Sequence, residues 1–358
     1  MDMLNDNTIT DALRNVQDPE LHRDIVSLDM VKEIHVDGTA VALRIDLTTP
    51  ACPLKDQIGA DIEAKVKGIG ATEVEITWGA TVRRAVSGQQ QENLVPGVKN
   101  IIAVASGKGG VGKSSISVNL ATSLALEGAS VGLLDADITG PNIPQMMGIE
   151  GQPAATPEGK IMPLERYGVK VISIQFFVPE GQPIVWRGPL VGGAIQQFLR
   201  DVDWGELDYL VVDMPPGTSD AQLTLAQSVP VSGSVLVTTP QDVALSDVEK
   251  ALRMFQKMSV PILGIVENMS TFICPHCNEP SEIFGRGGAE RFARAHDLHY
   301  FGGIPLDIKV RQGGDAGVPA VAQREPGPAA EIMREVARAV AGRVSMQAVE
   351  EAPVLTIT

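Results

Sequence analysis

The feature that most constrains this chain is a glycine-rich segment at residues 107–114, Gly-Lys-Gly-Gly-Val-Gly-Lys-Ser. It fits the pattern G-x-x-x-x-G-K-[ST], whose backbone N–H groups surround phosphate oxygens. Glycine is needed because a Cβ would obstruct the turn. Residues 101–105 predict a buried strand before the segment, and Ile116, Leu120 and Leu124 predict an amphipathic helix after it. Strand, loop and helix in this order are the context the motif requires, so we predict a nucleoside triphosphate site.

Two residues of this loop have distinct predicted roles. Lys113 is placed to pair with the β- and γ-phosphates, and Ser114 to ligate Mg²⁺. The start of the following helix adds partial positive charge. The other residues that we expect to contact the nucleotide are Gly107, Lys108, Gly109, Gly110, Val111, Gly112 and Ser115.

Acidic residues follow two further apolar runs. Residues 131–134 precede Asp135 and Asp137, and we assign Asp137 to orienting the attacking water, although a helix cap or a turn would also explain an Asp there. Residues 209–212 precede Asp213, which we expect to reach Mg²⁺ through water. Gly217, in the segment Pro-Pro-Gly, would let a backbone N–H approach the γ-phosphate, so this segment is predicted to be a switch.

Asn268 follows another apolar run, residues 262–266. Its amide both donates and accepts hydrogen bonds, which suits the edge of an adenine base. A turn residue is the alternative. We include Asn268 in the predicted nucleotide site.

Short apolar runs alternate with helical patterns from residue 100 onward, which predicts an α/β fold with a mostly parallel sheet flanked by helices. Ligands gather at the carboxyl ends of the strands in such sheets. The predicted strands are residues 131–134, 169–174, 209–212, 235–238, 262–266 and 299–304, and a helix at about residues 329–341 is predicted to pack on the core.

The first part of the chain predicts a separate, small α+β domain over residues 1–86. Its predicted elements are a helix at 8–14, strands near 34, at 41–47 and at 74–77, and a helix at 54–66. A segment rich in Ser, Gly and Gln follows, and we interpret residues 87–97 as a flexible linker. We expect the nucleotide-binding domain over residues 98–345 and a frayed tail over 346–358.

Charge and cysteine content exclude several classes of protein. The chain has 29 Lys and Arg against 44 Asp and Glu, a net charge of −15, which argues against a nucleic-acid or anionic membrane partner. The start lacks the pattern of a signal peptide, and no apolar run approaches the roughly 20 residues that span a bilayer. We therefore expect a cytoplasmic protein. Three cysteines do not make a disulfide framework and indicate metal or redox chemistry.

Cys274 and Cys277 form a C-x-x-C pair that directs two thiolates to one metal centre. A tetrahedral zinc site or a four-iron cluster needs about four ligands. A dimer with two cysteines from each subunit is the simplest completion, and structural zinc or a redox pair are the alternatives. Cys52 stands before Pro53 near a predicted helix start, where a thiolate is favoured. We treat it as a possible cluster-handling ligand or, equally, as a buried inert thiol.

With these motifs assembled, the chain resembles the deviant Walker A ATPases, the group of MinD, ParA and the nitrogenase iron protein. Lys108 carries this resemblance. The resemblance implies that ATP closes a homodimer, in which Lys108 of each subunit reaches across to the phosphates bound by the other subunit. The chain is similar to the Mrp/ApbC iron–sulfur carriers over roughly residues 97–342. The similarity lies in the order of its motifs, which are the loop, Asp135-Ala-Asp137, Trp186-Arg187-Gly188-Pro189, Asp213-Met-Pro-Pro-Gly217, Asn268-Met-Ser270 and Cys274-Pro-His-Cys277. Residues 48–53, Thr-Thr-Pro-Ala-Cys-Pro, resemble the MIP18-like domain that often precedes such carriers.

The resemblance implies a homodimeric ATP hydrolase that carries a labile [4Fe-4S] cluster at the dimer interface. It implies that a scaffold protein donates the cluster and that apo-proteins receive it. Lys108, Lys113, Asp137 and Asp213 would then carry the phosphoryl chemistry, and Cys274 and Cys277 the cluster. A positioning ATPase of the MinD/ParA type and an ATP-dependent reductase are the alternatives.

Overall fold

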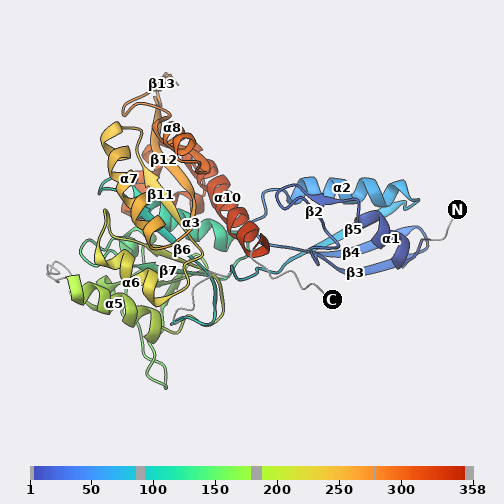
Figure 1. The fold of residues 1–358 in the computed structure, drawn as a ribbon, viewed down its shortest axis with the longest axis horizontal. Helices are drawn as coiled ribbons and strands as arrows, with labels where there is room; N and C mark the ends of the chain where they lie inside the picture. The colour runs from blue at the N-terminus through green and yellow to red at the C-terminus, as the bar shows by residue number, and fades with distance from the viewer. Residues whose placement is uncertain (1–3, 86–92, 179–187, 278, 351–358) are drawn as a thin grey trace. The chain divides into compact units, whose positions relative to one another are not determined.

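The computed structural model describes residues 4–85, 93–178, 188–277 and 279–350. The chain divides into two compact units, Met1–Ala85 with Ala341–Thr358 and Val86–Val340, and Figure 1 labels many of their helices and strands. Trp186 and Arg187, residues 87–92 of the expected linker and residues 351–358 of the expected tail lie outside the described residues.

The first unit holds a three-stranded sheet of β3 (Val31–Asp37), β4 (Ala40–Leu47) and β5 (Glu73–Ala80). β4 is antiparallel to β3 and parallel to β5. Large aliphatic residues occupy every second position of β4, between alanines or charged residues, and these aliphatic side chains are the buried ones. The remaining elements are α1 (Asp6–Leu13), the pair β1 (Gln17–Asp18) and β2 (Arg23–Asp24), and α2 (Lys55–Gly68). The predicted small α+β domain at this end of the chain is confirmed.

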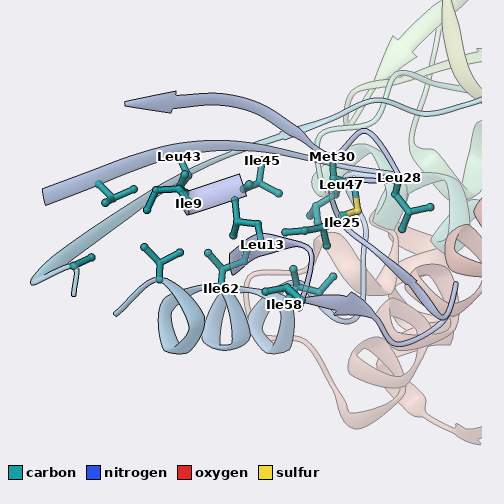
Figure 2. Packing of buried hydrophobic residues seen from close by; sticks show 14 residues of the cluster. Ile9, Leu13, Ile25, Leu28, Met30, Leu43, Ile45, Leu47, Ile58 and Ile62 are labelled. Carbon is teal, nitrogen blue, oxygen red and sulfur yellow. The ribbon is translucent and has the colours of Figure 1, made fainter. Parts of the chain in front are cut away.

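The core of this unit lies between the sheet and its two main helices. Figure 2 shows side chains of α1, β4 and α2 pointing toward one another, among them Ile9, Leu43 and Ile62. Ile9 and Ile62 are fully buried, and a buried side chain of this size stabilises a fold by about 1.5–3 kcal/mol. Val349, near the end of the chain, also packs against this cluster.

The second unit is built on a nine-stranded sheet with the order β13-β12-β11-β6-β10-β7-β9-β8, in which β14 also pairs with β12. All pairs are parallel except those of β8 with β9 and of β12 with β13. The mostly parallel sheet is therefore confirmed. Its strands are β6 (Val98–Ser106), β7 (Val131–Asp135), β8 (Leu164–Arg166), β9 (Val169–Ile172), β10 (Leu207–Asp213), β11 (Gly233–Thr238), β12 (Ile262–Ile273), β13 (Pro280–Ser281) and β14 (Tyr300–Leu306).

β9 and β12 end elsewhere than predicted. β9 ends at Ile172 because the Ser173 side chain accepts from the Gln175 N–H and starts the short 3₁₀ helix Ile174–Phe177. β12 does not end at Val266 but continues to Ile273. The longer β12 brings the segment of Asn268 and that of the cysteine pair onto one strand.

Helices cover the sheet on both faces, as predicted. α3 packs against β6, β7 and β10, and α7 packs against β6, β11 and β12. Connections between parallel strands are right-handed, so the direction of each step across the sheet decides which face its helix covers. The step from β6 to β7 runs one way and places α3 on one face. The later steps from β9 to β10, β11, β12 and β14 run the other way and place α5, α6, α7 and α8 on the opposite face. The helices are α3 (Lys113–Leu126), α4 (Ile143–Met147), α5 (Gly188–Asp201), α6 (Asp220–Ser228), α7 (Asp242–Lys257), α8 (Gly288–Ala295), α9 (Ile308–Ala316) and α10 (Pro328–Glu350), with a short 3₁₀ turn at Ala320–Ala322.

α10 ends later than predicted. It was expected to stop near Ala341 but runs to Glu350, and its residues from Ala341 onward belong to the first unit. There the Ser345 hydroxyl donates to the Thr48 carbonyl oxygen at 3.3 Å. Packing of this kind, which local sequence does not reveal, explains the additional turns. Within the described residues, no helix combines the length and the apolarity that crossing a membrane requires.

Candidate functional site

The phosphate-binding loop lies between the end of β6 at Ser106 and the start of α3 at Lys113. Gly110 and Gly112 have φ angles of 80° and 83°, in the left-handed region that favours glycine. A Cβ on Gly112 would also come within 2.1 Å of Asn268 Nδ2. Gly112 is therefore required both by its conformation and by its neighbour.

The centre of the site is a buried network around the Asp213 carboxylate, at the end of β10. Lys113 Nζ donates to Asp213 Oδ2 at 2.8 Å and the Ser114 hydroxyl donates to the same oxygen at 2.7 Å. The Ser117 hydroxyl donates to Oδ1 at 2.6 Å. Lys113 and Asp213 are only 6% and 1% exposed, so each charge depends on the other. The sequence analysis did not identify Ser117, although its position one helical turn after Lys113 places it on the same face of α3.

The carboxylates after β7 join this network from the neighbouring strand. Asp137 Oδ2 lies 3.7 Å from Lys113 Nζ, and burial raises the pKa of Asp137 while Lys113 lowers it. Burial and the nearby Asp213 carboxylate raise the pKa of Asp135 to about 8, against the hydrogen bond from the Ser173 hydroxyl, which lowers it. Lys113 is therefore surrounded by three carboxyl groups, of which Asp135 favours the neutral form below pH 8.

The segment after Asp213 is held to the loop by backbone hydrogen bonds. Gly217, with a φ of 80°, donates its N–H to the Ser106 carbonyl oxygen at 2.9 Å. This is the N–H that we expected at the γ-phosphate, so that role requires the segment to move and stays a prediction. Gln222 Nε2 donates to the carbonyl oxygens of Pro215 and Gly217, at 3.0 Å each. No sequence prediction included Gln222, although Ser219 followed three residues later by Gln222 is the pattern of a capping box.

A cavity of about 380 Å³ opens beside the loop. Asn268 lines it and donates its side-chain N–H to the Val111 carbonyl oxygen at 2.8 Å, so β12 is bonded directly to the phosphate-binding loop. Recognition of adenine by Asn268 stays a prediction. The residues that line the cavity are Gly112, Ser114, Ser115, Asn142, Gln145, Met146, Asn268, Met269, Pro305, Leu306, Asp307, Val310, Arg311, Gly314 and Asp315.

Cys274 and Cys277 lie in the turn between β12 and β13. Phe272 pairs with Ser281 across this hairpin, and Cys274 donates its N–H to the Glu279 carbonyl oxygen at 3.1 Å. Cys277 is exposed and Cys274 is half-buried. Hydrogen bonds from the backbone N–H groups of His276 and Cys277 lower the pKa of the Cys274 thiol, which favours the thiolate that binds metals. No group of three or more His, Cys, Asp or Glu side chains able to hold a metal occurs in the described part of the chain.

Cys52 differs from this pair. It is half-buried just before α2, where the sequence allows either a stabilised thiolate or a buried inert thiol. Burial raises the pKa of its thiol to about 11; the Leu54 N–H lowers this value, and the Asp18 and Glu20 carboxylates raise it further. Desolvation outweighs the favourable backbone N–H groups, so of the two alternatives these surroundings favour the buried, inert thiol.

Lys108 is the remaining residue with a predicted role. It is half-buried in the loop, and its carbonyl oxygen accepts from the Ser106 hydroxyl at 3.0 Å. Its ammonium takes part in none of the ion pairs found among the described residues. Lys108 thus differs from the paired Lys113.

A glycine-rich loop between a central strand and a helix, with carboxylates after two neighbouring strands, defines a P-loop NTPase. The sequence profile of the family described as NUBPL iron-transfer P-loop NTPase matches residues 97–341, and that of the iron-sulfur cluster assembly protein family matches residues 6–78. The chain belongs to the NUBPL iron-transfer P-loop NTPase family, preceded by a domain of the assembly-protein family. The resemblance inferred from the sequence is confirmed.

Relatives match over nearly the whole chain. An iron-sulfur cluster carrier protein of Deinococcus radiodurans is 50% identical over 345 residues, which cover 96% of each chain. A protein of the same description from Escherichia coli is 44% identical, over 95% of this chain and 92% of its own.

Solved structures agree with the fold. A nucleotide-binding protein of Archaeoglobus fulgidus, solved with ADP, is 43% identical over 64% of this chain and 90% of its own, with a TM-score of 0.56. The cell division ATPase MinD of Pyrococcus furiosus, 23% identical with a TM-score of 0.52, covers 67% of this chain and 98% of its own and shares the fold.

Proposed function

We propose that this chain is a cytoplasmic, ATP-hydrolysing carrier that binds a labile [4Fe-4S] cluster as its cargo and delivers it to apo-proteins. The observation that carries the proposal is the course of β12. One strand lines the nucleotide cavity at Asn268 and ends at Ile273, directly before Cys274 in the hairpin that exposes Cys277. The same strand therefore connects the nucleotide site to the turn that carries the two thiols. The relatives described as cluster carriers support the same function.

A homodimer completes the cluster site in this proposal. One hairpin supplies two thiols, whereas a four-iron cluster takes about four ligands. Two hairpins facing each other across a twofold axis would provide the set. Because Cys277 is exposed and Cys274 is only half-buried, such a cluster would be accessible to a donor scaffold and to recipients. Lys108 of each subunit would reach the phosphates bound by the other.

The phosphoryl chemistry follows from the network around Asp213. The oxygen atoms of Ser114 and Asp213 fit Mg²⁺, a hard cation that prefers oxygen ligands. Magnesium held by Ser114 and, through water, by Asp213 would neutralise charge on the phosphates. Lys113 now pairs with Asp213, and a bound triphosphate would offer its ammonium a second anionic partner. Asp137, close to Lys113 and half-buried, is placed to orient the attacking water.

Hydrolysis would be signalled by the segment that follows Asp213. The Gly217 N–H exchanges its present acceptor, the Ser106 carbonyl oxygen, for a phosphate oxygen when the triphosphate is bound. Loss of the γ-phosphate reverses this exchange. In this way the occupancy of the site changes the backbone conformation near the proposed dimer interface.

Anaerobic reconstitution with iron and sulfide tests the proposal. The expected result is a brown protein with half a [4Fe-4S] cluster per chain, which transfers its cluster to an apo-acceptor. A colourless protein that retains zinc would overturn the carrier function. A stable cluster with no transfer would favour an electron-transfer role instead.

A further inference from the structure

A bulge interrupts β12 between the nucleotide cavity and the cysteine hairpin. Asn268 pairs with Ile304 of β14, and the next pair along the strand is Phe272 with Leu306. β12 therefore advances four residues where β14 advances two. Such bulges bend a strand and re-aim its side chains. This bulge sets the direction in which β12 leaves the nucleotide site for the hairpin.

Met269 is the first residue of the bulge and has a strained backbone. Its φ of 57° lies in the left-handed region, which a non-glycine residue adopts only when its surroundings enforce it. Its side chain lines the nucleotide cavity, and its Cε lies 3.8 Å from the position that a Cβ on Gly112 would occupy. The phosphate-binding loop and the cavity are therefore part of the surroundings that hold Met269 in this conformation.

The residues before the bulge are anchored on both sides. Asn268 Nδ2 donates to the Val111 carbonyl oxygen of the loop at 2.8 Å. The buried Glu267 carboxylate accepts from the N–H groups of Gly287, at 3.0 Å, and Ala289, at 2.8 Å, where α8 begins. A displacement of the loop would therefore act on β12 at Asn268. Because Glu267 fixes the strand to α8, the bulge that follows is the part of β12 that would take up such a displacement.

The nucleotide cavity also shares a wall with the surroundings of the hairpin. A second cavity of about 430 Å³ is lined by Phe272, Ile273 and Pro275 next to the cysteines. Residues 305–307, at the end of β14, line both cavities. A nucleotide in the first cavity thus packs against the wall that supports the hairpin.

We propose that Met269 and its bulge are a positioning element that transmits nucleotide occupancy to the cysteine hairpin. A bound nucleotide packs on Met269 and on the shared wall, holds the bulge in one geometry, and so restricts the hairpin that carries Cys274 and Cys277. The proposal rests on the proposed function for the role of these cysteines as cargo ligands. The link itself is a property of the metal-free chain and is tested there.

The test measures the alkylation rates of Cys274 and Cys277 by N-ethylmaleimide in the metal-free full chain, with mass spectrometry of the peptides. Saturating ADP with Mg²⁺ is compared with no nucleotide, in samples that show the same single species by size exclusion. We expect both alkylation rates to be about fivefold lower with ADP, which is at the low end of the coupling commonly found between two sites of one protein. A glycine at this position adopts the left-handed conformation readily and many others as well, so the bulge is no longer held in one geometry. In Met269→Gly, ADP should therefore change the alkylation rates of Cys274 and Cys277 by less than about twofold.

Ser259→Gly is the matched control. Ser259 has a φ of 56° and is exposed at the end of α7, so the substitution relieves the same conformation away from the site. It should keep the full effect of ADP. Saturation is verified for each variant, so a change of affinity does not enter the comparison.

Two results would overturn the proposal: rates in the unmodified chain that do not respond to ADP, or a Met269→Gly variant that keeps the full response. If Met269→Gly does not fold, hydrogen exchange of the backbone amides of residues 270–273 in the unmodified chain decides. Slower exchange with ADP supports the link, and unchanged exchange contradicts it. Failure to bind iron would overturn the proposed function but leave these measurements intact.

Discussion

The Ser117 hydroxyl donates to Asp213 Oδ1 at 2.6 Å while the Ser114 hydroxyl donates to Oδ2 at 2.7 Å. The two serines lie on α3 and hold both oxygens of a carboxylate that follows β10. Asp213 is therefore oriented from the helix that begins at the phosphate-binding loop. Only one of the two serines belongs to the loop motif.

Ser117→Ala should lower the ATP turnover number by about tenfold, because loss of a residue that orients a metal-site ligand typically costs 10–100-fold. Phosphate release at saturating ATP and magnesium measures this. Ser123→Ala is the control: Ser123 is buried on the same helix and its hydroxyl has no hydrogen-bond partner in the described part of the chain. Equal turnover in the two variants would show that the Ser117 hydrogen bond does not orient Asp213 for catalysis.

Lys113→Ala should abolish hydrolysis while the fold persists. It also removes the cation from a pair that is almost fully buried, which costs about 3–5 kcal/mol in comparable sites. The nucleotide-free variant should therefore melt at a lower temperature by circular dichroism. Lys99→Ala removes a more exposed pair with Asp208 and should cost less than about 1 kcal/mol. Unchanged turnover in Lys113→Ala would refute its phosphate role.

Cys277→Ala should abolish stable cluster binding and leave nucleotide affinity nearly intact, because the hairpin turn contributes no residue to the nucleotide cavity. Iron analysis after reconstitution and an ADP titration measure the two effects. Cys52→Ala should keep its iron, since the Cys52 thiol is desolvated and protonated at neutral pH. Equal iron content in Cys277→Ala and the unmodified chain would contradict the ligand assignment.

The two kinds of thiol should react with iodoacetamide in a fixed order. At pH 8, Cys274 should be modified first, because backbone N–H groups lower the pKa of its thiol and the turn is exposed. Cys52 should be modified last in the folded, metal-free protein, because burial raises the pKa of its thiol to about 11. Peptide mass spectrometry over time gives the order. Faster modification of Cys52 than of Cys274 would contradict these environments.

The stability of the nucleotide-free protein should fall as pH rises from about 4 to about 8. Asp135 has a pKa of about 8 in the folded chain and an ordinary value of 3.8, so within this window the folded state binds the extra proton and the unfolded state does not. This contribution is present at low pH and is lost as pH rises through the folded value.

Asp135→Asn should therefore raise the melting temperature at pH 8. The fall of the melting temperature between pH 5 and pH 8 should also be smaller in this variant than in the unmodified chain. Each kcal/mol corresponds to about 2–4 °C for a domain of this size. The control Asp203→Asn replaces an exposed carboxylate of the same unit and should leave the decline unchanged. A decline as steep in Asp135→Asn as in the unmodified chain would rule out Asp135 as its source.

The sequence predicted the features that depend on residues close together in the chain. The motif at residues 107–114 and the apolar runs beside it located the loop, β6 and α3, because phosphate binding and a buried parallel strand each demand particular residues at short spacing. Asp137, Asp213 and Asn268 were found in the same way, since each follows such a strand. The small α+β domain was found from alternation along β4 and from the pattern of α2.

Tertiary structure decided where helices and strands end and which protonation state each buried side chain adopts. β9 stops at Ser173, β12 continues past Val266 to the cysteines, and α10 extends to Glu350 on contacts that lie far apart in sequence. The protonation of Asp135 and of Cys52 is likewise set by burial that local sequence does not reveal. Hydrogen-bond partners and desolvation depend on the neighbours that packing brings together, whereas periodicity and motif chemistry are properties of the chain itself.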